Sequence, residues 1–272
     1  MTRPVQVVAH RGSSGVRAEH TLGAYEQALT DGADAVECDV RLTRDGVLVC
    51  VHDRRVDRTS DGRGVVSTLE LRELAELDFA SWKARQADPL LEAAWEEADT
   101  DPERGKVLTF ERLLELVLAE PSGRRVQLQV ETKHPTRYGG LVERRLVEVL
   151  ARHGLLTPLS RSVSPVAVLS YAPTSLRRVH AMAPLLPTVL NMDRVPVRYR
   201  DGSLPPQVAA AGIALKHVKA YPYLVERFQA RGHRVHVFTA DAPEDIDLLL
   251  ELGVDAVISN HPRRVLTRLG RV

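Results

Sequence analysis

Short valine-rich runs alternate with stretches of helical periodicity along most of the chain, and no other feature restricts the possible folds as strongly. Runs that are apolar on both faces are typical of parallel strands covered by helices. Repeated strand and helix units over roughly 250 residues predict an α/β protein, a (β/α)8 TIM-type barrel that occupies residues 1–272 as a single domain. The predicted strands are Val5–Ala9, Ala35–Val40, Val47–Val51, Val126–Val130, Val166–Leu169, Thr188–Leu190, Val235–Phe238, Ala256–Ile258 and, as a weaker ninth, Ala214–Val218.

The helices are predicted from apolar residues spaced three or four apart and from residue types that mark helix ends. The first follows Thr21, a residue type that caps helix N-termini, and ends at Asp31-Gly32, because glycine favours the helix C-terminus. Further helices are predicted to begin at Thr68 and Thr109 and to cover Gly140–Arg152, Pro173–Met182, Tyr223–Arg231 and Ala242–Leu252.

Two segments depart from a regular barrel. The link from Val40 to Val47 contains the turn signal Asp45-Gly46 but is too short for a parallel crossover, which needs about a dozen residues. Either this crossover lacks its helix or the segment forms a local hairpin, and nine strand candidates for eight places pose the same question. The second segment, residues 78–106, is polar and acidic and contains Trp82 and Trp95. It is predicted to be an insertion after the third strand, on the barrel top, where the tryptophans either line a lid or pack the insertion onto the barrel.

Composition excludes several classes of protein. Lys and Arg total 37 and Asp and Glu total 36, so the net charge is 37 − 36 = +1, which argues against a non-specific nucleic-acid binder. No apolar run approaches the roughly 18 residues of a membrane span, and the N-terminus does not resemble a signal peptide, so we expect a cytoplasmic protein. Two cysteines are too few for a disulfide framework. Cys38 alternates with Glu37 and Asp39, whereas Cys50 lies two residues before His52 and would share its face. If Glu37, Asp39 and His52 all point inward, Cys38 and Cys50 are buried on opposite sides of the barrel wall.

Charged clusters follow or end four of the apolar runs, where barrel enzymes place their active sites. The clusters are His10-Arg11-Gly12, Glu37-Cys38-Asp39, His52-Asp53 and Glu131-Thr132-Lys133. Strand alternation directs Glu37 and Asp39 inward together, and does the same for Glu131 and Lys133. Three converging carboxylates repel one another unless a cation lies among them. Oxygen ligands favour Mg²⁺ or Ca²⁺, and no cysteine and histidine spacing typical of zinc is present.

The order of these motifs resembles the glycerophosphodiester phosphodiesterases. The matching segments are Val8-Ala-His-Arg-Gly12, Glu19-His-Thr21, Val36-Glu-Cys-Asp-Val40, Asp45-Gly-Val-Leu-Val, His52-Asp53, Asp57-Arg-Thr59, Val130-Glu-Thr-Lys133, Val235-His-Val-Phe-Thr-Ala-Asp241 and Leu252-Gly-Val-Asp-Ala-Val-Ile-Ser-Asn260. The resemblance covers nearly the whole chain and is weakest at residues 80–106 and 190–215. It implies a metal-dependent barrel that cleaves a small phosphodiester substrate into an alcohol and glycerol 3-phosphate.

The resemblance also implies a role for each residue of the charged clusters. The metal ligands would be Glu37, Asp39 and Glu131, and the general acid/base pair would be His10 and His52. The phosphate oxygens would be held by Arg11 and Lys133. Two histidines can take one proton and give another near neutral pH, as phosphodiester cleavage requires. The neighbouring glycerol hydroxyl is expected to attack first, which gives a cyclic phosphate that water then opens.

The chain departs from the family pattern at two places near the expected site. His20 stands where the family has asparagine, and Phe238 stands where the family has tryptophan. The first is interpreted either as an extra titratable group or as a loop histidine, and the second leaves the substrate head group open. Two alternatives therefore remain: a phosphodiesterase for lysophospholipids or sphingolipids on the same barrel, and a barrel that binds phosphate esters without cleaving them. The second alternative would be expected if a catalytic histidine or a metal ligand were missing.

Overall fold

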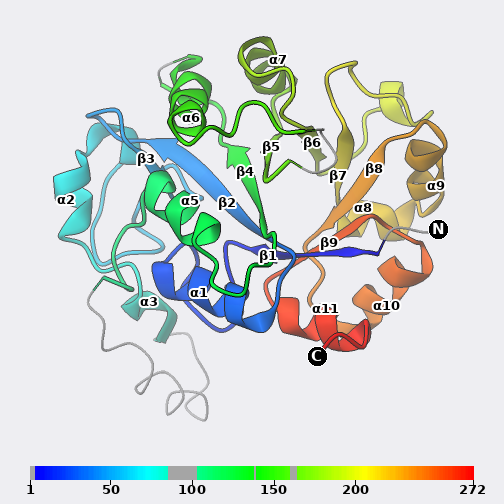
Figure 1. Cartoon of the computed structure of the whole chain (residues 1–272), viewed down its shortest axis with the longest axis horizontal. Coiled ribbons are helices and arrows are strands. Elements are labelled where there is room, and N and C mark those ends of the chain that lie inside the picture. Colours follow the sequence, from blue (N-terminus) through cyan, green and yellow to red (C-terminus); the bar gives the residue numbers. More distant parts are fainter. Residues whose placement is uncertain (1–3, 85–102, 138, 160–163) are drawn as a thin grey trace.

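Eight parallel strands form a closed ring in the computed structural model, which describes residues 4–84, 103–137, 139–159 and 164–272. The first strand pairs with strands from both ends of the chain, Val8 with Ala35 and Val7 with Val257, and this double pairing closes the barrel. The predicted (β/α)8 barrel is therefore confirmed (Figure 1). The ring contains β1 (Gln6–His10), β2 (Ala35–Leu42), β4 (Gln127–Thr132), β5 (Val166–Ser170), β6 (Thr188–Met192), β7 (Ala210–Ala214), β8 (Arg234–Phe238) and β9 (Ala256–Ser259).

Helices surround the ring and cover its outer face (Figure 1). The longer helices are α1 (Leu22–Asp31), α5 (Phe110–Leu118), α6 (Leu141–Arg152), α7 (Pro173–Met182), α9 (Tyr223–Ala230), α10 (Pro243–Glu251) and α11 (Pro262–Arg268). The predicted caps are present: the Thr21 hydroxyl accepts from the Ala24 amide, and Gly32 ends α1 with φ +92°. The Thr109 hydroxyl likewise accepts from the Arg112 amide at the start of α5.

The short link after Val40 forms a hairpin, which decides between the two interpretations of that segment. Strand β3 (Leu48–Cys50) runs antiparallel to β2, with Val40 opposite Cys50, and lies outside the ring. Gly46 has φ +85° in the turn, a conformation that glycine adopts without a steric penalty. The chain therefore leaves the barrel after β2 and returns to the ring only at β4.

The expectation that Cys38 and Cys50 lie on opposite sides of the barrel wall is wrong. Both thiols belong to the core cluster between the barrel and its helices, and the pKa of Cys38 is raised by burial and by the adjacent Cys50. Antiparallel pairing of Val40 with Cys50 puts Cys38, two residues earlier, on the same face as Cys50. The error came from extending the alternation of β3 to His52, although the strand ends at Cys50.

The weak ninth strand at Ala214–Val218 is also wrong. The strand is β7, which ends at Ala214, and the next residues form the helix α8 (Leu215–Ala220). Alanine and glycine fill most of β7 and have low strand propensity, so the run lacked the valine signal of the other strands. The connection from β6 to β7 contains only the single-turn 3₁₀ helix η3 (Val197–Tyr199).

The segment after the hairpin contains η1 (Val66–Thr68), α2 (Leu71–Ala75) and α3 (Ser81–Ala84). Most of the predicted insertion, including Trp95, lies outside the described residues. Trp82 is buried, and its indole N–H donates to the Phe79 carbonyl at 2.9 Å. The next residue, Lys83, donates to the Ser14 carbonyl in the loop after β1, at 2.9 Å. This part of the segment therefore packs onto the barrel.

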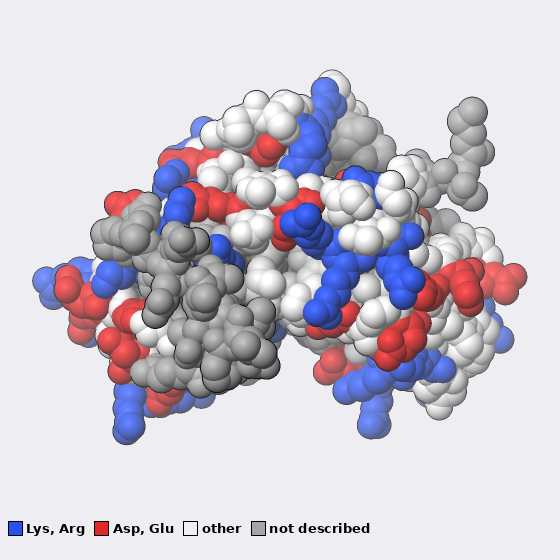
Figure 2. Space-filling view, turned by 90° about the horizontal axis from the view of Figure 1, so that it is seen from below, with Lys and Arg blue, Asp and Glu red and all other residues white. Residues whose placement is uncertain are grey.

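Charged side chains of both signs are interspersed on the face of the molecule shown in Figure 2, in keeping with the net charge near zero. Lys and Arg side chains there lie beside Asp and Glu and do not form one continuous basic area. Among the described residues, no helix is both long enough and apolar enough to span a bilayer.

Candidate active site

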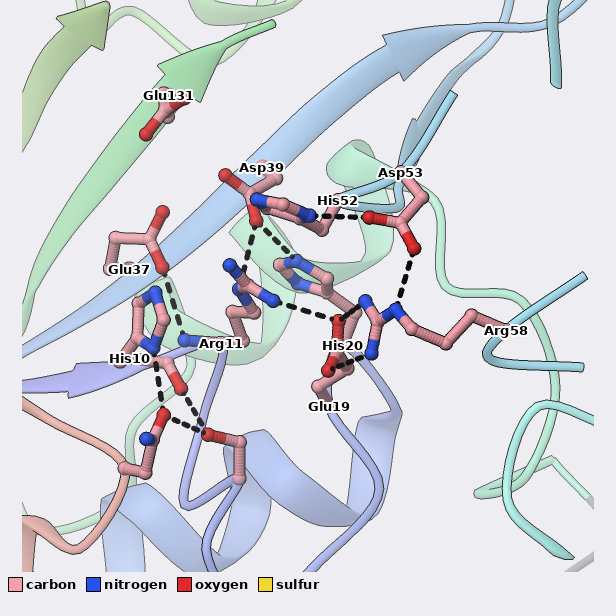
Figure 3. A network of polar contacts seen from close by, with 12 residues as sticks. His10, Arg11, Glu19, His20, Glu37, Asp39, His52, Asp53, Arg58 and Glu131 are labelled. Atoms are coloured by element: carbon pink, nitrogen blue, oxygen red, sulfur yellow. Dashed lines mark hydrogen bonds and ion pairs between the residues drawn. The ribbon is translucent and has the colours of Figure 1, made fainter. Parts of the chain in front are cut away.

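Three carboxylates converge at the carboxyl end of the barrel. Glu37 and Asp39 project from β2, and Glu131 projects from β4, where it is the register partner of Asp39. Each of the three is buried, and each offers an oxygen atom within 4.8 Å of the other two. Figure 3 shows them on adjacent strands, with Glu37 and Asp39 on the same face of β2. The predicted inward alternation of both strands is therefore confirmed.

Buried negative charge dominates the electrostatics of this cluster. Burial, together with the charges of neighbouring carboxylates, raises the pKa of Glu37 and Glu131. Burial also acts to raise the pKa of Asp39, but Lys133, His20 and Arg11 hold it well below its usual range. The Lys133 ammonium lies 2.8 Å from Asp39 Oδ1 and 2.5 Å from Glu131 Oε1. Two cations thus face three carboxylates, a donor set of hard oxygens that fits one further divalent cation.

His10 ends β1 and is held in one tautomer. Its Nδ1 lies 2.7 Å from Asn260 Oδ1, and the amide of Asn260 is fixed because its Nδ2 donates to Asp241 at 2.6 Å. Since Asn260 Oδ1 can only accept, Nδ1 carries the hydrogen and the neutral ring keeps a lone pair on Nε2. Burial, helped by the Arg11 charge, lowers the pKa of His10 to about 4. The ring is therefore neutral at physiological pH and can accept a proton.

His52 follows the hairpin and is not held by the ladder of the ring. Its Nδ1 donates to Asp53 Oδ1 at 2.6 Å, and its carbonyl accepts from Arg41 Nε at 2.9 Å and from Arg41 Nη2 at 2.7 Å. Burial lowers the pKa of His52, while the charge of Asp39 and the hydrogen bond that His52 donates to Asp53 oppose that effect. Arg41 was not predicted as a site residue, although the alternation of Glu37 and Asp39 already directs it to the same face of β2.

A chain of ion pairs outside the acidic cluster holds Arg11 in place. Its Nη1 donates to Glu19 at 3.0 Å and its Nε lies 3.1 Å from Asp39 Oδ2. Glu19 also pairs with Arg58, at 2.7 Å, and Arg58 pairs with Asp53, at 2.6 Å (Figure 3). Hydrogen bonds from Arg58 and the Arg11 charge outweigh burial and lower the pKa of Glu19 to about 2. Glu19 therefore stays ionised and orients both guanidinium groups.

His20 is a buried structural partner of the acidic cluster. Its Nε2 lies 2.9 Å from Asp39 Oδ2 and its Nδ1 lies 2.8 Å from the Tyr25 hydroxyl. Burial is the main cause that lowers its pKa, and its backbone has φ +63°. Asparagine tolerates this left-handed conformation better than most residues, which fits the asparagine of the family pattern at this position. His20 therefore precedes the N-cap of α1, as expected for a loop histidine, but it also contacts the acidic cluster through Asp39.

Asn191 and Gly212 also belong to the site. Neither was predicted, because the sequence analysis found site residues by their charge and these two are uncharged. The Asn191 amide donates to Glu131 Oε2 at 3.0 Å. A Cβ atom at Gly212, on the neighbouring strand, would lie 2.1 Å from Asn191 Oδ1. Gly212 thus provides the space in which Asn191 lies, and nothing in the sequence pattern of β6 or β7 indicated this pair.

A cavity of about 420 Å³ opens at these residues and is lined by both charged and apolar side chains. Six of the seven predicted site residues line it, and the seventh, Asp39, lies buried beneath it in contact with Arg11 and Lys133. Tyr171 and Phe238 also line the cavity, with ring centroids 6.0 Å apart in an edge-to-face arrangement. Trp82 does not line the cavity. The full lining is His10, Arg11, Glu37, His52, Glu131, Lys133, Leu169, Tyr171, Asn191, Asp193, Phe238, Thr239 and Ile258.

Comparison with known proteins assigns the chain to a family. The sequence model of the glycerophosphoryl diester phosphodiesterase family matches residues 10–264. The chain belongs to this family. A probable glycerophosphodiester phosphodiesterase 1 of Mycobacterium tuberculosis is 46% identical over 260 residues, which cover 95% of this chain and 90% of that protein. A glycerophosphodiester phosphodiesterase of Bacillus subtilis is 32% identical, over 95% of this chain and 84% of that protein.

A solved phosphodiesterase structure shares the fold of this chain. It is a phosphodiesterase of Oleispira antarctica in complex with its product, sn-glycerol-3-phosphate. It superposes with a TM-score of 0.80 at 26% identity and covers 97% of this chain and 96% of its own. The resemblance to the glycerophosphodiester phosphodiesterases that the sequence motifs indicated is thus confirmed.

Proposed function

We propose that this protein hydrolyses glycerophosphodiesters to an alcohol and glycerol 3-phosphate. The observation that carries the proposal is the convergence of two histidines, two cations and an acidic cluster at the mouth of one barrel. Family membership and the glycerol phosphate bound to the Oleispira antarctica relative support the substrate class. The alternative of a non-catalytic barrel depended on the loss of a histidine or a carboxylate, and all of them are present.

The acidic cluster would hold one divalent ion through Glu37, Asp39 and Glu131. Burial, followed by the charges of the neighbouring carboxylates, raises the pKa values of the two glutamates, and a bound cation would favour their ionised forms. When bound, Mg²⁺ or Ca²⁺ would supply Lewis acidity to a phosphoryl oxygen. Metal-to-oxygen distances distinguish the two ions, at about 2.0–2.1 Å for Mg²⁺ and 2.3–2.6 Å for Ca²⁺.

The two histidines would divide the proton transfers. His10 Nε2 takes the proton of the attacking hydroxyl as the new P–O bond forms, because its ring is neutral and Asn260 fixes its tautomer. His52 in its protonated form gives a proton to the leaving alkoxide as the ester P–O bond breaks, and Asp53 stabilises that imidazolium. Arg11 binds the phosphoryl oxygens in a forked geometry, and Lys133 provides a point charge.

We also propose that the neighbouring hydroxyl of the glycerol attacks first and forms a cyclic phosphate. His10 then serves as the base for this hydroxyl, and the two histidines exchange roles when water opens the ring. Trapping of a cyclic glycerol phosphate in a single turnover would support this route. Incorporation of ¹⁸O from water directly into the first product, with no cyclic species, would support direct attack by water.

The decisive experiment measures glycerol 3-phosphate release from a panel of diesters, with and without chelator. We expect turnover that stops in chelator and returns with Mg²⁺ or Ca²⁺. His10→Ala and His52→Ala should each abolish turnover, whereas His233→Ala, which lies before β8 at the opposite end of the barrel, should retain it. Folding of each variant is checked by circular dichroism. A folded His10→Ala or His52→Ala protein with normal turnover would remove that residue from the mechanism.

A lipid substrate is not favoured by the described residues. That alternative relied on Trp82 and Trp95 as an apolar lining, but Trp82 packs against Phe79 and does not reach the cavity. Comparison of turnover on glycerophosphocholine and on a lysophospholipid tests the preference directly. We expect the water-soluble diester to be the better substrate.

A further inference from the structure

A second cavity, of about 440 Å³, lies beside the active-site cavity at the mouth of the barrel. Its walls come from the loop after β6, from Arg200, which follows η3, and from α8 with the residue that follows that helix. The two cavities meet at Asp193, which lines both, and the Tyr171 hydroxyl of the first cavity lies 3.5 Å from Asp193 Oδ1. The lining of this second cavity is Asp193, Arg194, Arg200, Lys216, His217, Ala220 and Tyr221.

The second cavity is electropositive, in contrast to the first. Arg194, Arg200 and Lys216 bring three positive charges, and Asp193 brings one negative charge, so the walls carry 3 − 1 = +2 with His217 neutral. Among the described residues, none of these three cations has a carboxylate partner within ion-pair distance, whereas Lys219, on the same helix, pairs with Asp245 at 2.6 Å. Unneutralised charges grouped in a concave site attract anions.

Two buried polar atoms in these walls have no partner. His217 is only 6% exposed, and its Nε2 has no hydrogen-bond partner among the described residues. The Nε atom of Arg200 is also buried without a partner. Both side chains pack against Tyr221, whose ring centroid lies 4.8 Å from that of His217 and 5.3 Å from Arg200 Cζ. Buried polar groups in native proteins are nearly always paired, so this arrangement indicates a ligand with hydrogen-bonding oxygens.

We propose that this second cavity binds a phosphate group carried by the same substrate molecule, on the half of the diester that extends past Tyr171 and Asp193. The inference rests on the proposed function, because it adds a second recognition site to that reaction. It predicts that the enzyme prefers diesters whose alcohol carries a phosphate monoester over diesters with an uncharged alcohol. Asp193, at the junction, faces the uncharged carbon and hydroxyl portion that links the two phosphates.

The test compares two diesters that differ only in the second phosphate, glycerophosphoglycerol and glycerophosphoglycerol phosphate. Loss of the diester signal is followed by ³¹P NMR, so that both substrates are measured in the same way. In the Arg194→Gln/Lys216→Gln variant, KM for the phosphorylated diester should rise about tenfold or more, since charge-assisted hydrogen bonds are lost. KM for glycerophosphoglycerol, whose alcohol carries no phosphate, should change less than about twofold.

The matched control is Arg198→Gln/Lys219→Gln. It also removes one arginine charge and one lysine charge, here from η3 and α8. Arg198 stacks on Tyr199, Lys219 pairs with Asp245, and neither residue lines the cavity. Both diesters should keep their KM in this variant. A parent protein with equal kcat/KM for the two diesters, or a cavity variant that changes both KM values equally, would overturn the proposal.

A binding measurement separates failure of this proposal from failure of the proposed function. If neither diester is hydrolysed, the catalytic assignment fails, and the second cavity is then judged by NMR titration of the His217 ring with inorganic phosphate. Phosphate should shift the His217 resonances and raise its pKa in the parent but not in the Arg194→Gln/Lys216→Gln variant, with His233 as the remote reference. An unresponsive His217 would overturn the site, and a response without any preference between the diesters would overturn its link to the substrate.

Discussion

Protonation of His236 should control much of the acid sensitivity of this barrel. His236 lies on β8, two residues before Phe238, which lines the active-site cavity, so its side chain lies deeper inside the barrel. It is 4% exposed, and its Nδ1 has no hydrogen-bond partner among the described residues. Burial, with the charge of Arg234 acting in the same direction and that of Asp255 opposing it, lowers the pKa of His236 to about 4.

The sign and size of the effect follow from proton linkage. The pKa of His236 is near 6.5 in the unfolded chain and about 4 in the folded chain, so the unfolded state binds more protons between these values. Stability is therefore fully present above pH 6.5 and is lost as the pH falls towards 4. For this one group, the free energy of unfolding should be about 2 kcal/mol lower at pH 5 than at pH 7.

The measurement is urea unfolding at pH 5 and at pH 7, for the parent and for His236→Leu. Comparison of each variant with itself at the two pH values cancels any change in packing caused by the substitution. His236→Leu should lose less stability on acidification than the parent, by about 2 kcal/mol. An equal loss in the parent and in His236→Leu would refute the assignment of the buried neutral histidine.

Three further outcomes are expected at the active site. Arg41→Met should lower kcat/KM by about 10- to 100-fold, because the His52 carbonyl loses charge-assisted hydrogen bonds of about 1.5–3 kcal/mol. Arg41→Lys should recover part of the lost kcat/KM. Unchanged kinetics in Arg41→Met would contradict this positioning role. His20→Asn should keep the fold and most activity. His20→Leu should lower the free energy of unfolding in urea by about 1–3 kcal/mol, because Asp39 loses the hydrogen bond from His20 Nε2. Equal stability of the two variants would contradict this role of His20. Calorimetric titration should detect one divalent ion per chain, and Glu131→Gln should weaken it; two ions would contradict a single site.

The sequence was sufficient for those parts of the site that stand on regular strands. Alternation on β2 and β4 correctly directed Glu37, Asp39 and Glu131 to one side, because each strand is long enough for the pattern to hold. Residues held by tertiary packing were not predictable in this way. Asn191 reaches Glu131 only because Gly212, from another strand, leaves room for it, and no local pattern records such a pair.

Local patterns also failed where a strand ends early. The alternation was carried from Cys50 to His52, but β3 stops at Cys50, so the prediction placed Cys50 on the wrong side of the barrel wall. A repeated motif, in contrast, had a structural role that only the fold could show. The segments Gly32-Ala-Asp-Ala-Val36 and Gly253-Val-Asp-Ala-Val257 are similar, and each leads from a helix end into a strand. Asp34 and Asp255 occupy the same position in them, and each accepts a hydrogen bond from a backbone amide of a neighbouring strand, that of Val7 and that of Val235 respectively.

The site combines two kinds of support, and the difference bears on catalysis. His10 and the three carboxylates stand on strands of the closed ring, where neighbouring strands fix the backbone on both sides. His52 stands beyond the added hairpin, where Arg41 and Asp53 hold it through three hydrogen bonds. The proton donor that we propose is therefore attached through residues outside the ring, and it can be adjusted there without disturbing the carboxylates. Changes in the accepted leaving alcohol should therefore arise more readily from the segment after the hairpin and from the loop after β6 than from the ring itself, because His52 and Asp193 of these segments line the cavity and do not belong to the acidic cluster.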